Sequence, residues 1–204
     1  CYGSPLVIAK HIVEDQLAPA IIGEDPENIE LLWQRMYWRN VPNGRTGLVM
    51  GCISGIDIAL WDILGKAAKM PVSKMLGAHS DRVPAYASGG FYAPGKDLDG
   101  LKKEVEGYLK KGYQDVKIKI GRNPEIAGNA VNYTASTEFA VSYDEDIRRI
   151  AATRELVGPR GRVAADINAA WPVEAVLNAV RDFRSAGLSW LEEPILFEDE
   201  EGLK

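Results

Sequence analysis

The sequence predicts an α/β protein in which a helical region precedes the first half of a (β/α)8 TIM-type barrel. Two observations predict this fold. Residues 1–80 show apolar spacing of the helical kind, whereas residues 81–204 alternate strand and helix, with four strands. Short connections between strands and helices are typical of a parallel sheet flanked by helices. Four strands are half of the eight in a barrel, which takes about 250 residues when complete.

Three helices are expected in the first region. The first covers residues 5–17, follows a serine, and repeats apolar residues at steps of three and four. The second is expected to begin at Pro26, because Asp25 is a good N-cap residue and proline suits the first helical position. The third contains residues 53–64, whose apolar residues again form a stripe with helical spacing.

The second region is expected to contain four βα units. The strands are predicted at residues 83–89, 115–120, 162–168 and 189–194, and the helices at 98–112, 144–158 and 172–187. The first of these helices is amphipathic, and each of the three ranges ends in glycine, a common helix terminator. An insertion at about 122–142 is longer than the roughly 2–6 residues of an ordinary βα loop. We expect this insertion to be mobile or to become ordered over a ligand.

Composition and charge argue against several classes of partner. The chain is 46% hydrophobic and 26% charged, which is ordinary for a globular protein. Its net charge is −5 and it lacks a Lys/Arg-rich stretch, so nucleic acid is not expected as a partner. No apolar run approaching the roughly 20 residues of a bilayer span and no secretory signal were recognised. We therefore expect a cytoplasmic protein without a membrane partner, in which Cys1 and Cys52 are reduced thiols.

An open doubly wound sheet also fits the alternation of strands and helices. The glycines after the first strand, in "SGGFYAPG", do not follow the GxGxxG pattern that holds a dinucleotide. This difference weakens the dinucleotide-binding interpretation and favours the barrel.

Charged residues in three of the strands break the apolar pattern expected of buried strands. Side chains of a strand alternate between its two faces, so Lys117 and Lys119 share the face opposite the apolar residues of their strand. The same alternation places Asp166 with Asn168 in the third strand, and Glu192 on one face of the fourth. A buried ion-pair network is the structural alternative, but desolvation makes such networks a poor source of stability. Three strands with the same feature favour a functional site.

The residue types at these positions indicate one kind of chemistry. Carboxylates on neighbouring strands, here Asp166 and Glu192, suit a hard divalent cation with oxygen ligands, and magnesium is the first choice. A lysine beside a second lysine and a metal can act as a base near neutral pH. A base combined with a cation that stabilises a developing oxyanion is suited to removing a proton next to a carboxylate.

Several motifs together resemble the mandelate racemase/muconate lactonizing enzyme family of the enolase superfamily, and its mandelate racemase-like subgroup in particular. The stretch "SGIDIALWDILGKAAKMPVSKMLGA" is similar to a helix of that group's capping domain and the chain that leaves it. "VKIKIG" is similar to its Lys-x-Lys strand, "DIN" to its Asp-x-Asn motif, and "WLEEP" to its Glu-Glu-Pro motif. The resemblance implies that residues 1–80 are part of an α+β capping domain.

The resemblance also implies a role for each matching residue. Lys119 would be the catalytic base, and Lys117 would make it easier to deprotonate. Asp166 and Glu192 would be the first two ligands of Mg2+. Three further residues would bind the substrate: Tyr86, Ser88 and Asn168.

Two departures from the family pattern limit the site. The third metal ligand and the acid or base on the opposite face would lie beyond Lys204. The insertion also widens the spacing between Lys119 and Asp166. We therefore expect this chain alone to be incomplete and inactive.

Three functions remain open from the sequence. The first is an acid-sugar dehydratase, which "YASGGFYAPGK" resembles; the second is a racemase or epimerase of a 2-hydroxy acid or related carboxylate, which "WLEEPILFEDEEG" resembles. The third is a non-catalytic fragment or degenerate binding module, against which the joint presence of Lys119, Asp166 and Glu192 argues. We expect a small-molecule carboxylate as the substrate and a homo-oligomer as the assembled state.

Overall fold

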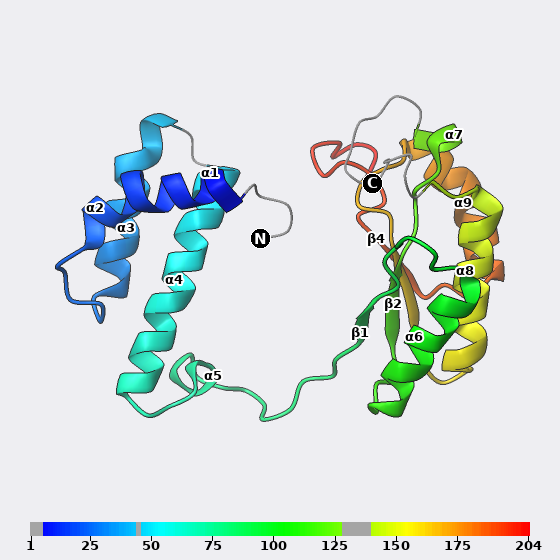
Figure 1. Ribbon diagram of the computed structural model, residues 1–204, viewed down its shortest axis with the longest axis horizontal. Helices are drawn as coiled ribbons and strands as arrows, with labels where there is room; N and C mark the ends of the chain where they lie inside the picture. Colours follow the sequence, from blue (N-terminus) through cyan, green and yellow to red (C-terminus); the bar gives the residue numbers. More distant parts are fainter. Residues whose placement is uncertain (1–5, 44–45, 128–139) are drawn as a thin grey trace. The chain divides into compact units, whose positions relative to one another are not determined.

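The computed structural model describes residues 6–43, 46–127 and 140–204. The chain separates into two compact units, residues 1–82 and residues 83–204 (Figure 1). The first unit is helical, and the second contains a parallel sheet with its helices.

The described part of the first unit consists of helices joined by turns. They are α1 (Leu6–His11), the π-helix η1 (Ile12–Leu17), α2 (Ala18–Ile21), α3 (Ile29–Asn40), the 3-10 helix η2 (Val41–Asn43), α4 (Leu48–Ala67) and α5 (Val72–Met75). The first expected helix therefore continues through a π-helical segment and extends to Ile21. Leu17, Met36 and Ile53 are fully buried and form one centre of the helical core.

The start of α3 differs from the prediction. The helix begins at Ile29 rather than Pro26, and Asn28 occupies the position before it. The Asp25 carboxylate instead accepts a hydrogen bond of 2.9 Å from the backbone N–H of Glu27. This bond to the residue two positions on stabilises a local turn, and it competes with the helical cap that the sequence suggested.

Helix α4 corrects the expectation that no apolar run approaches the length of a membrane span. It has 20 residues and contains an 18-residue stretch with a mean hydropathy of 1.7, enough to cross a bilayer by length and composition. Asp57 and Asp62 interrupt the apolar run in the sequence, but the helix as a whole remains apolar because Ile, Leu, Val and Ala fill most of the positions around them. Core helices can have the same length and composition. Ile53 and Leu60 pack in the helical core.

The second unit contains a four-stranded parallel sheet in the order β1-β2-β3-β4. Its elements are β1 (Ala87–Gly89), α6 (Leu98–Lys110), β2 (Val116–Lys119), α7 (Pro124–Ala127), α8 (Tyr143–Val157), β3 (Val163–Asp166), α9 (Val173–Ser185) and β4 (Trp190–Glu192). The prediction of four adjacent parallel strands in chain order is confirmed, although each strand is shorter than expected. Closure into a barrel remains a prediction.

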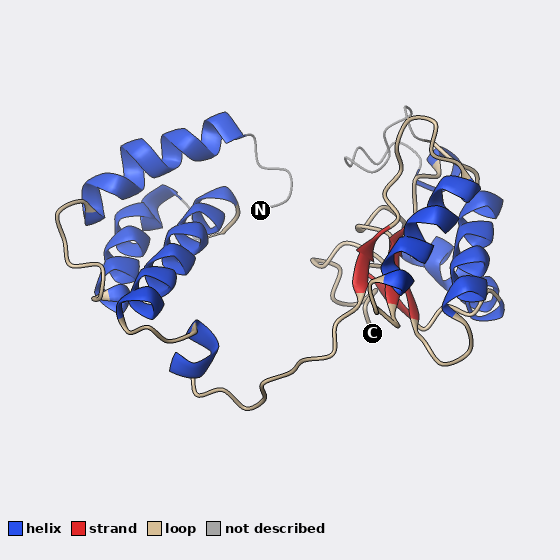
Figure 2. Cartoon of the chain, turned by 60° about the horizontal axis from the view of Figure 1, so that its bottom comes forward, coloured by secondary structure: helices blue, strands red, loops and turns tan. Residues whose placement is uncertain are grey.

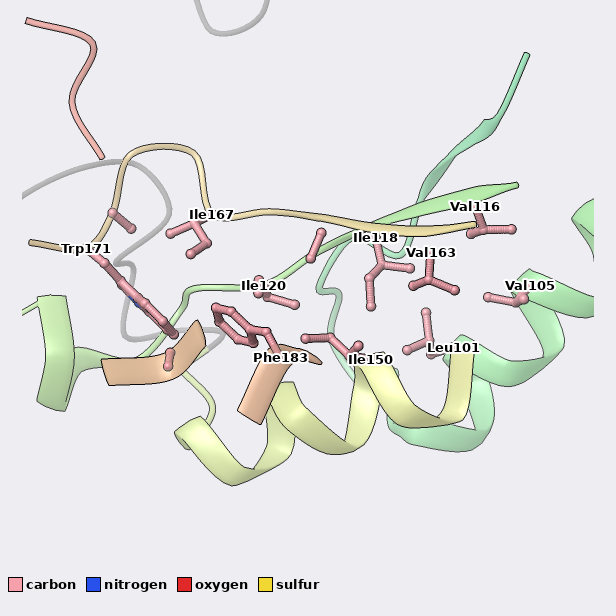
Figure 3. Close-up of a cluster of buried hydrophobic side chains, with 13 residues drawn as sticks. Leu101, Val105, Val116, Ile118, Ile120, Ile150, Val163, Ile167, Trp171 and Phe183 are labelled. Carbon is pink, nitrogen blue, oxygen red and sulfur yellow. The ribbon is translucent and has the colours of Figure 1, made fainter. Parts of the chain in front are cut away.

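Helices α6, α8 and α9 lie on one side of this sheet (Figures 1 and 2). Their apolar side chains, such as Leu101, Ile150 and Phe183, form one buried cluster with Val116, Ile118 and Ile120 in and after β2 (Figure 3). Strand alternation therefore directs the apolar residues toward the helices and leaves the charged residues on the opposite face.

The described ends of the insertion are packed rather than loose. The backbone N–H of Val141 donates to the carbonyl of Arg122 at 2.9 Å, which joins the two ends of the segment. Asn123 is fully buried, and its amide donates to the Val141 carbonyl at 3.1 Å. Backbone pairing and a buried amide hold these ends, which counts against the prediction that the segment 122–142 is mobile or ordered only over a ligand. Residues 128–139 lie outside the described residues.

Candidate functional site

Three of the predicted site residues form one row across the sheet. Lys119 of β2 is the register partner of Asp166 of β3, and Asp166 is the register partner of Glu192 of β4. Register partners on parallel strands direct their side chains to the same face, so all three lie on the face opposite the helices. The row stands at the carboxyl ends of the strands, which is where barrel enzymes place their sites.

A second row lies one pleat below the first on the same face. Ser88 is the register partner of Lys117, which pairs in turn with Ala164, and Ala164 pairs with Trp190. Ser88 is exposed, and only 9% of the Lys117 side chain is accessible. The sheet thus brings both lysines and both carboxylates together, as the strand alternation predicted.

Each lysine of the site is paired with a carboxylate. The ammonium of Lys119 binds Oδ2 of Asp166, and the ammonium of Lys117 binds Oε1 of Glu192. Lys117 Nζ also lies 3.9 Å from Asp166 Oδ2. The four charges therefore form a connected network, with Asp166 in contact with both lysines.

Each ammonium group has a carboxylate partner in addition to the like charge of the neighbouring lysine. Burial by itself lowers the pKa of Lys117, but the hydrogen bond and charge of Glu192, followed by contacts with Tyr86, outweigh burial and raise the pKa. Strand alternation indicates that the two lysines are neighbours, but it does not show the carboxylates at hydrogen-bond distance, which favour the charged form.

Aromatic rings border the charged network. The Tyr86 ring centroid lies 5.4 Å from Lys117 Nζ, and Tyr86 also meets the Trp190 ring edge-on with centroids 5.4 Å apart. Phe91 lies in the loop after β1, with its ring centroid 5.7 Å from Lys119 Nζ. Tyr86 was predicted for the site, whereas Phe91 was not. Phe91 comes directly after Gly89 and Gly90 at the end of β1, and this position is the signal that could have identified it.

Asn168 lies near the site but departs from strand alternation. Its φ is +55°, and Glu193 likewise has a φ of +43°, so the extended backbone ends before each of them. The Asn168 side-chain amide donates to Oε2 of Glu193 at 3.1 Å, while its backbone N–H donates to Oδ1 of Asp166 at 2.8 Å. In a regular strand, Asn168 would share a face with Asp166, two residues before it. Here Asn168 instead supports the Asp166 carboxylate through a hydrogen bond from its backbone N–H.

Asp166 and Glu192 have the chemistry of two ligands for a hard cation. Both offer carboxylate oxygens on neighbouring strands, and Asp166 is only 2% exposed. Oxygen ligands of this kind suit Mg2+. Among the described residues, no group of three or more His, Cys, Asp and Glu side chains converges on one point. The two carboxylates thus fit part of a magnesium site.

A second polar cluster behind the strand ends was missed in the sequence. Asp146 and Arg149 of α8 are almost completely buried, at 0% and 2% exposure. Burial raises the pKa of Asp146, against the opposing effect of hydrogen bonds from Tyr92, Gly121 and Asn123. The sequence of α8 indicated only a helix that ends in glycine, and charged residues of a surface helix usually face solvent.

The chain matches two family descriptions. Residues 1–77 match the mandelate racemase/muconate lactonizing enzyme N-terminal domain, and residues 100–204 match the enolase C-terminal domain-like family. Among curated proteins, the chain is 39% identical over 183 residues to arabinonate dehydratase of Saccharolobus solfataricus, covering 90% of this chain and 44% of the relative. It is 35% identical over 189 residues to L-talarate/galactarate dehydratase of Salmonella typhimurium, covering 92% and 42%.

Solved structures show the same similarity. A racemase from Streptomyces coelicolor with bound magnesium is 32% identical, with a TM-score of 0.79 over 96% of this chain and 49% of that one. L-talarate/galactarate dehydratase of Salmonella typhimurium is 33% identical, with a TM-score of 0.73 over 96% and 44%. The chain therefore spans less than half the length of these relatives.

Proposed function

Because the chain belongs to the mandelate racemase/muconate lactonizing enzyme family of the enolase superfamily, we propose that it supplies part of a magnesium-dependent site for acid-sugar dehydration. The observation that carries the proposal is the row of Lys119, Asp166 and Glu192 across three adjacent strands, with Lys117 on the same face. A base and two oxygen ligands thereby lie together at the end of the sheet where barrel enzymes act.

Lys119 is the base in this proposal. It stands in the outer row, at the last position of β2, and its ammonium already reaches the carboxylate of a predicted metal ligand. Lys117 lies two residues deeper and is paired with Glu192. It orients Glu192 and supplies positive charge toward the substrate carboxylate.

Asp166 and Glu192 hold Mg2+ in this proposal, and the described residues bring no third His, Cys, Asp or Glu side chain to the same point. When bound, the cation offsets the negative charge that develops on the substrate carboxylate as its α-proton leaves. The cation and the two ammonium groups compete for the same carboxylate oxygens, because Asp166 and Glu192 are the partners of the lysines. When the cation occupies these oxygens, a lysine loses its anionic partner. This loss favours the unprotonated form of that lysine.

Tyr86, Ser88 and Asn168 line the substrate pocket in the same proposal. Tyr86 and Ser88 lie on the site face of β1 or directly before it, and Asn168 follows β3. A polyhydroxylated carboxylate suits this mixture of aromatic, hydroxyl and amide groups.

Dehydration is favoured over racemisation by the relatives. The arabinonate and L-talarate/galactarate dehydratases are 39% and 35% identical over most of the chain. In a dehydratase, the electrons of the α C–H bond form a double bond as the β C–O bond breaks, and the hydroxyl leaves as water after receiving a proton. The alternative of a racemase or epimerase is supported by the similarity to the Streptomyces coelicolor racemase. We place the enzyme in the cytoplasm as a homo-oligomer.

The test uses the full-length protein with magnesium and a panel of acid sugars in deuterated water. Proton NMR follows both exchange of the α-proton and formation of a 2-keto-3-deoxy product. Product formation supports the dehydratase, whereas exchange with inversion and no product supports the racemase. Absence of exchange across the panel, in protein shown to bind magnesium, would contradict both enzymatic functions and favour a binding module.

A further inference from the structure

Helix α8 holds the strand end that carries Lys119. Arg149 Nη2 donates to the carbonyl of Gly90, after β1, at 2.6 Å and to the carbonyl of Lys119 itself at 3.4 Å. One guanidinium group therefore connects the carboxyl ends of two neighbouring strands. Both contacts are made to backbone, so they fix the course of the chain rather than a mobile side chain.

Asp146, one helical turn before Arg149, binds the next peptide group of the same segment. Its Oδ2 accepts hydrogen bonds from the backbone N–H of Gly121 at 2.8 Å and from the Asn123 amide at 3.0 Å. Its Oδ1 accepts a hydrogen bond of 2.5 Å from the Tyr92 hydroxyl. The peptide groups on both sides of Ile120 are thus anchored to α8, immediately after the proposed base.

Burying this cluster of charged and polar side chains costs free energy. Arg149 is 2% exposed, and its Nε has no hydrogen-bond partner among the residues the structure describes. The nearest carboxylate oxygen, Oδ1 of Asp146, lies 3.9 Å from that Nε. Burying a guanidinium with incomplete hydrogen bonding is a weak contribution to stability. Its two backbone contacts at the site end of the sheet point to a positional role.

We propose that Arg149, supported by Asp146, is a positioning residue that sets where the Lys119 amine stands. The proposal rests on the proposed function of Lys119 as the base. The physical reason is that a displacement of about 1 Å at a reacting group can lower its rate by about 100-fold. Tyr92 belongs to the same unit, since its ring lies 4.4 Å from the Arg149 guanidinium and its hydroxyl binds Asp146.

The same helix offers a matched control in Arg154. Arg154 also donates from its guanidinium to backbone carbonyls, those of Gly161 at 2.7 Å and Gly187 at 3.0 Å. These glycines precede β3 and β4, so Arg154 joins the amino ends of the strands, opposite the site. Loss of either arginine removes similar bonds from the same helix, but only Arg149 is bonded at the end that carries Lys119.

The experiment compares Arg149→Lys and Arg154→Lys in the full-length protein. Lysine keeps the charge but replaces the rigid guanidinium, whose Nη2 reaches both carbonyls, with an ammonium on a flexible stem of different length and geometry. For Arg149→Lys we expect kcat for α-proton exchange to fall by about 10- to 100-fold, with KM changed less than about two-fold. For Arg154→Lys we expect a lower melting temperature with kcat unchanged. Equal losses of kcat in the two variants would overturn the positioning role.

Amide hydrogen exchange gives a readout that does not depend on activity. Arg149→Lys should speed exchange at Ile120 and Gly121, whereas Arg154→Lys should not. Unchanged exchange at these amides in Arg149→Lys would contradict the inference even if the wild-type protein proved inactive on every acid sugar. Inactive wild type with faster exchange in Arg149→Lys would instead contradict the proposed function alone.

A milder variant covers the case in which Arg149→Lys does not fold. Tyr92→Phe keeps the ring beside the guanidinium and removes only the hydrogen bond to Asp146. We expect the same direction of change in kcat and in amide exchange at Gly121, with smaller size. No change in either measurement for Tyr92→Phe would then count against the cluster as a positioning unit.

Discussion

Lys119 and Asp166 are register partners on neighbouring parallel strands, and their side chains form an ion pair across β2 and β3. Asp166 also lies 3.9 Å from the ammonium of Lys117. The proposed base and the proposed metal ligand therefore interact directly. A change at either residue alters the electrostatic environment of the other.

The first prediction concerns Lys119 as the base. Lys119→Met keeps an unbranched apolar side chain but removes the amine, so we expect α-proton exchange in the full-length enzyme to fall by at least about 10²–10⁴-fold. NMR in deuterated water measures the exchange, and calorimetry checks that substrate and magnesium still bind. Lys110→Met, at an exposed position of α6, is the control and should exchange normally. Near-normal exchange in Lys119→Met would remove this lysine from the mechanism.

The second prediction concerns magnesium binding. Asp166→Asn replaces a buried carboxylate with an amide that carries no charge, and we expect the affinity for magnesium to fall by at least about 10- to 100-fold. Isothermal titration of the full-length protein measures the change. Asp99→Asn removes an equal charge from an exposed position of α6 and should leave affinity unchanged. An unaltered affinity in Asp166→Asn would show that this residue is not a ligand.

The third prediction concerns the pH dependence of stability. Burial tends to raise the pKa of Glu104, but hydrogen bonds from Lys96, Tyr108 and the Gly90 N–H outweigh it, and the pKa is lowered. A carboxyl with a lowered folded-state pKa stabilises the fold above its unfolded pKa of about 4.3, and this contribution is lost as the pH falls through the folded value. Glu104→Gln should therefore cost on the order of 1–2 kcal/mol at pH 7, and less at acidic pH.

Urea unfolding at a series of pH values measures this difference. Glu106→Gln, on the same helix at an exposed position, is the control and should show little change at any pH. A difference between wild type and Glu104→Gln that stays constant from pH 7 to well below the unfolded pKa would contradict the assignment. It would indicate a loss of packing instead of a loss of charge.

The fourth prediction concerns the turn after β1. Gly90 has a φ of +64°, and a Cβ placed there would lie 2.7 Å from Cβ of Ile118. Gly90→Ala should therefore destabilise the protein by at least about 1–3 kcal/mol, because strain and overlap add. Gly95 has a φ of +68° but open space around its Cβ position, so Gly95→Ala isolates the cost of the left-handed backbone. Equal losses in the two variants by urea unfolding would show that the close approach to Ile118 is unimportant.

Local regularities explain why much of the site could be predicted. The direction of a side chain in a strand depends on residues adjacent in sequence, so alternation alone placed Lys117, Lys119 and Asp166 on the face opposite the apolar residues of their strands. In the fourth strand both faces carry apolar residues and a glutamate, so Glu192 was assigned through the resemblance of "WLEEP" to the Glu-Glu-Pro motif. The alternation stopped being informative where the extended backbone ended. Asn168 and Glu193 have positive φ, a conformation that neither residue requires by its chemistry, and their mutual hydrogen bond follows from it.

The sequence by itself determined the number and order of the strands, the face on which the charges lie, and the kind of chemistry that these charges support. Only the tertiary structure decided which charge meets which, since register joins Lys119 to Asp166 across 47 positions in the chain. It also decided that Arg149 binds the carbonyl of Gly90, 59 residues away. Contacts of this kind depend on how strands and helices pack together. The sequence of α8 does not indicate which backbone groups of the sheet its side chains contact.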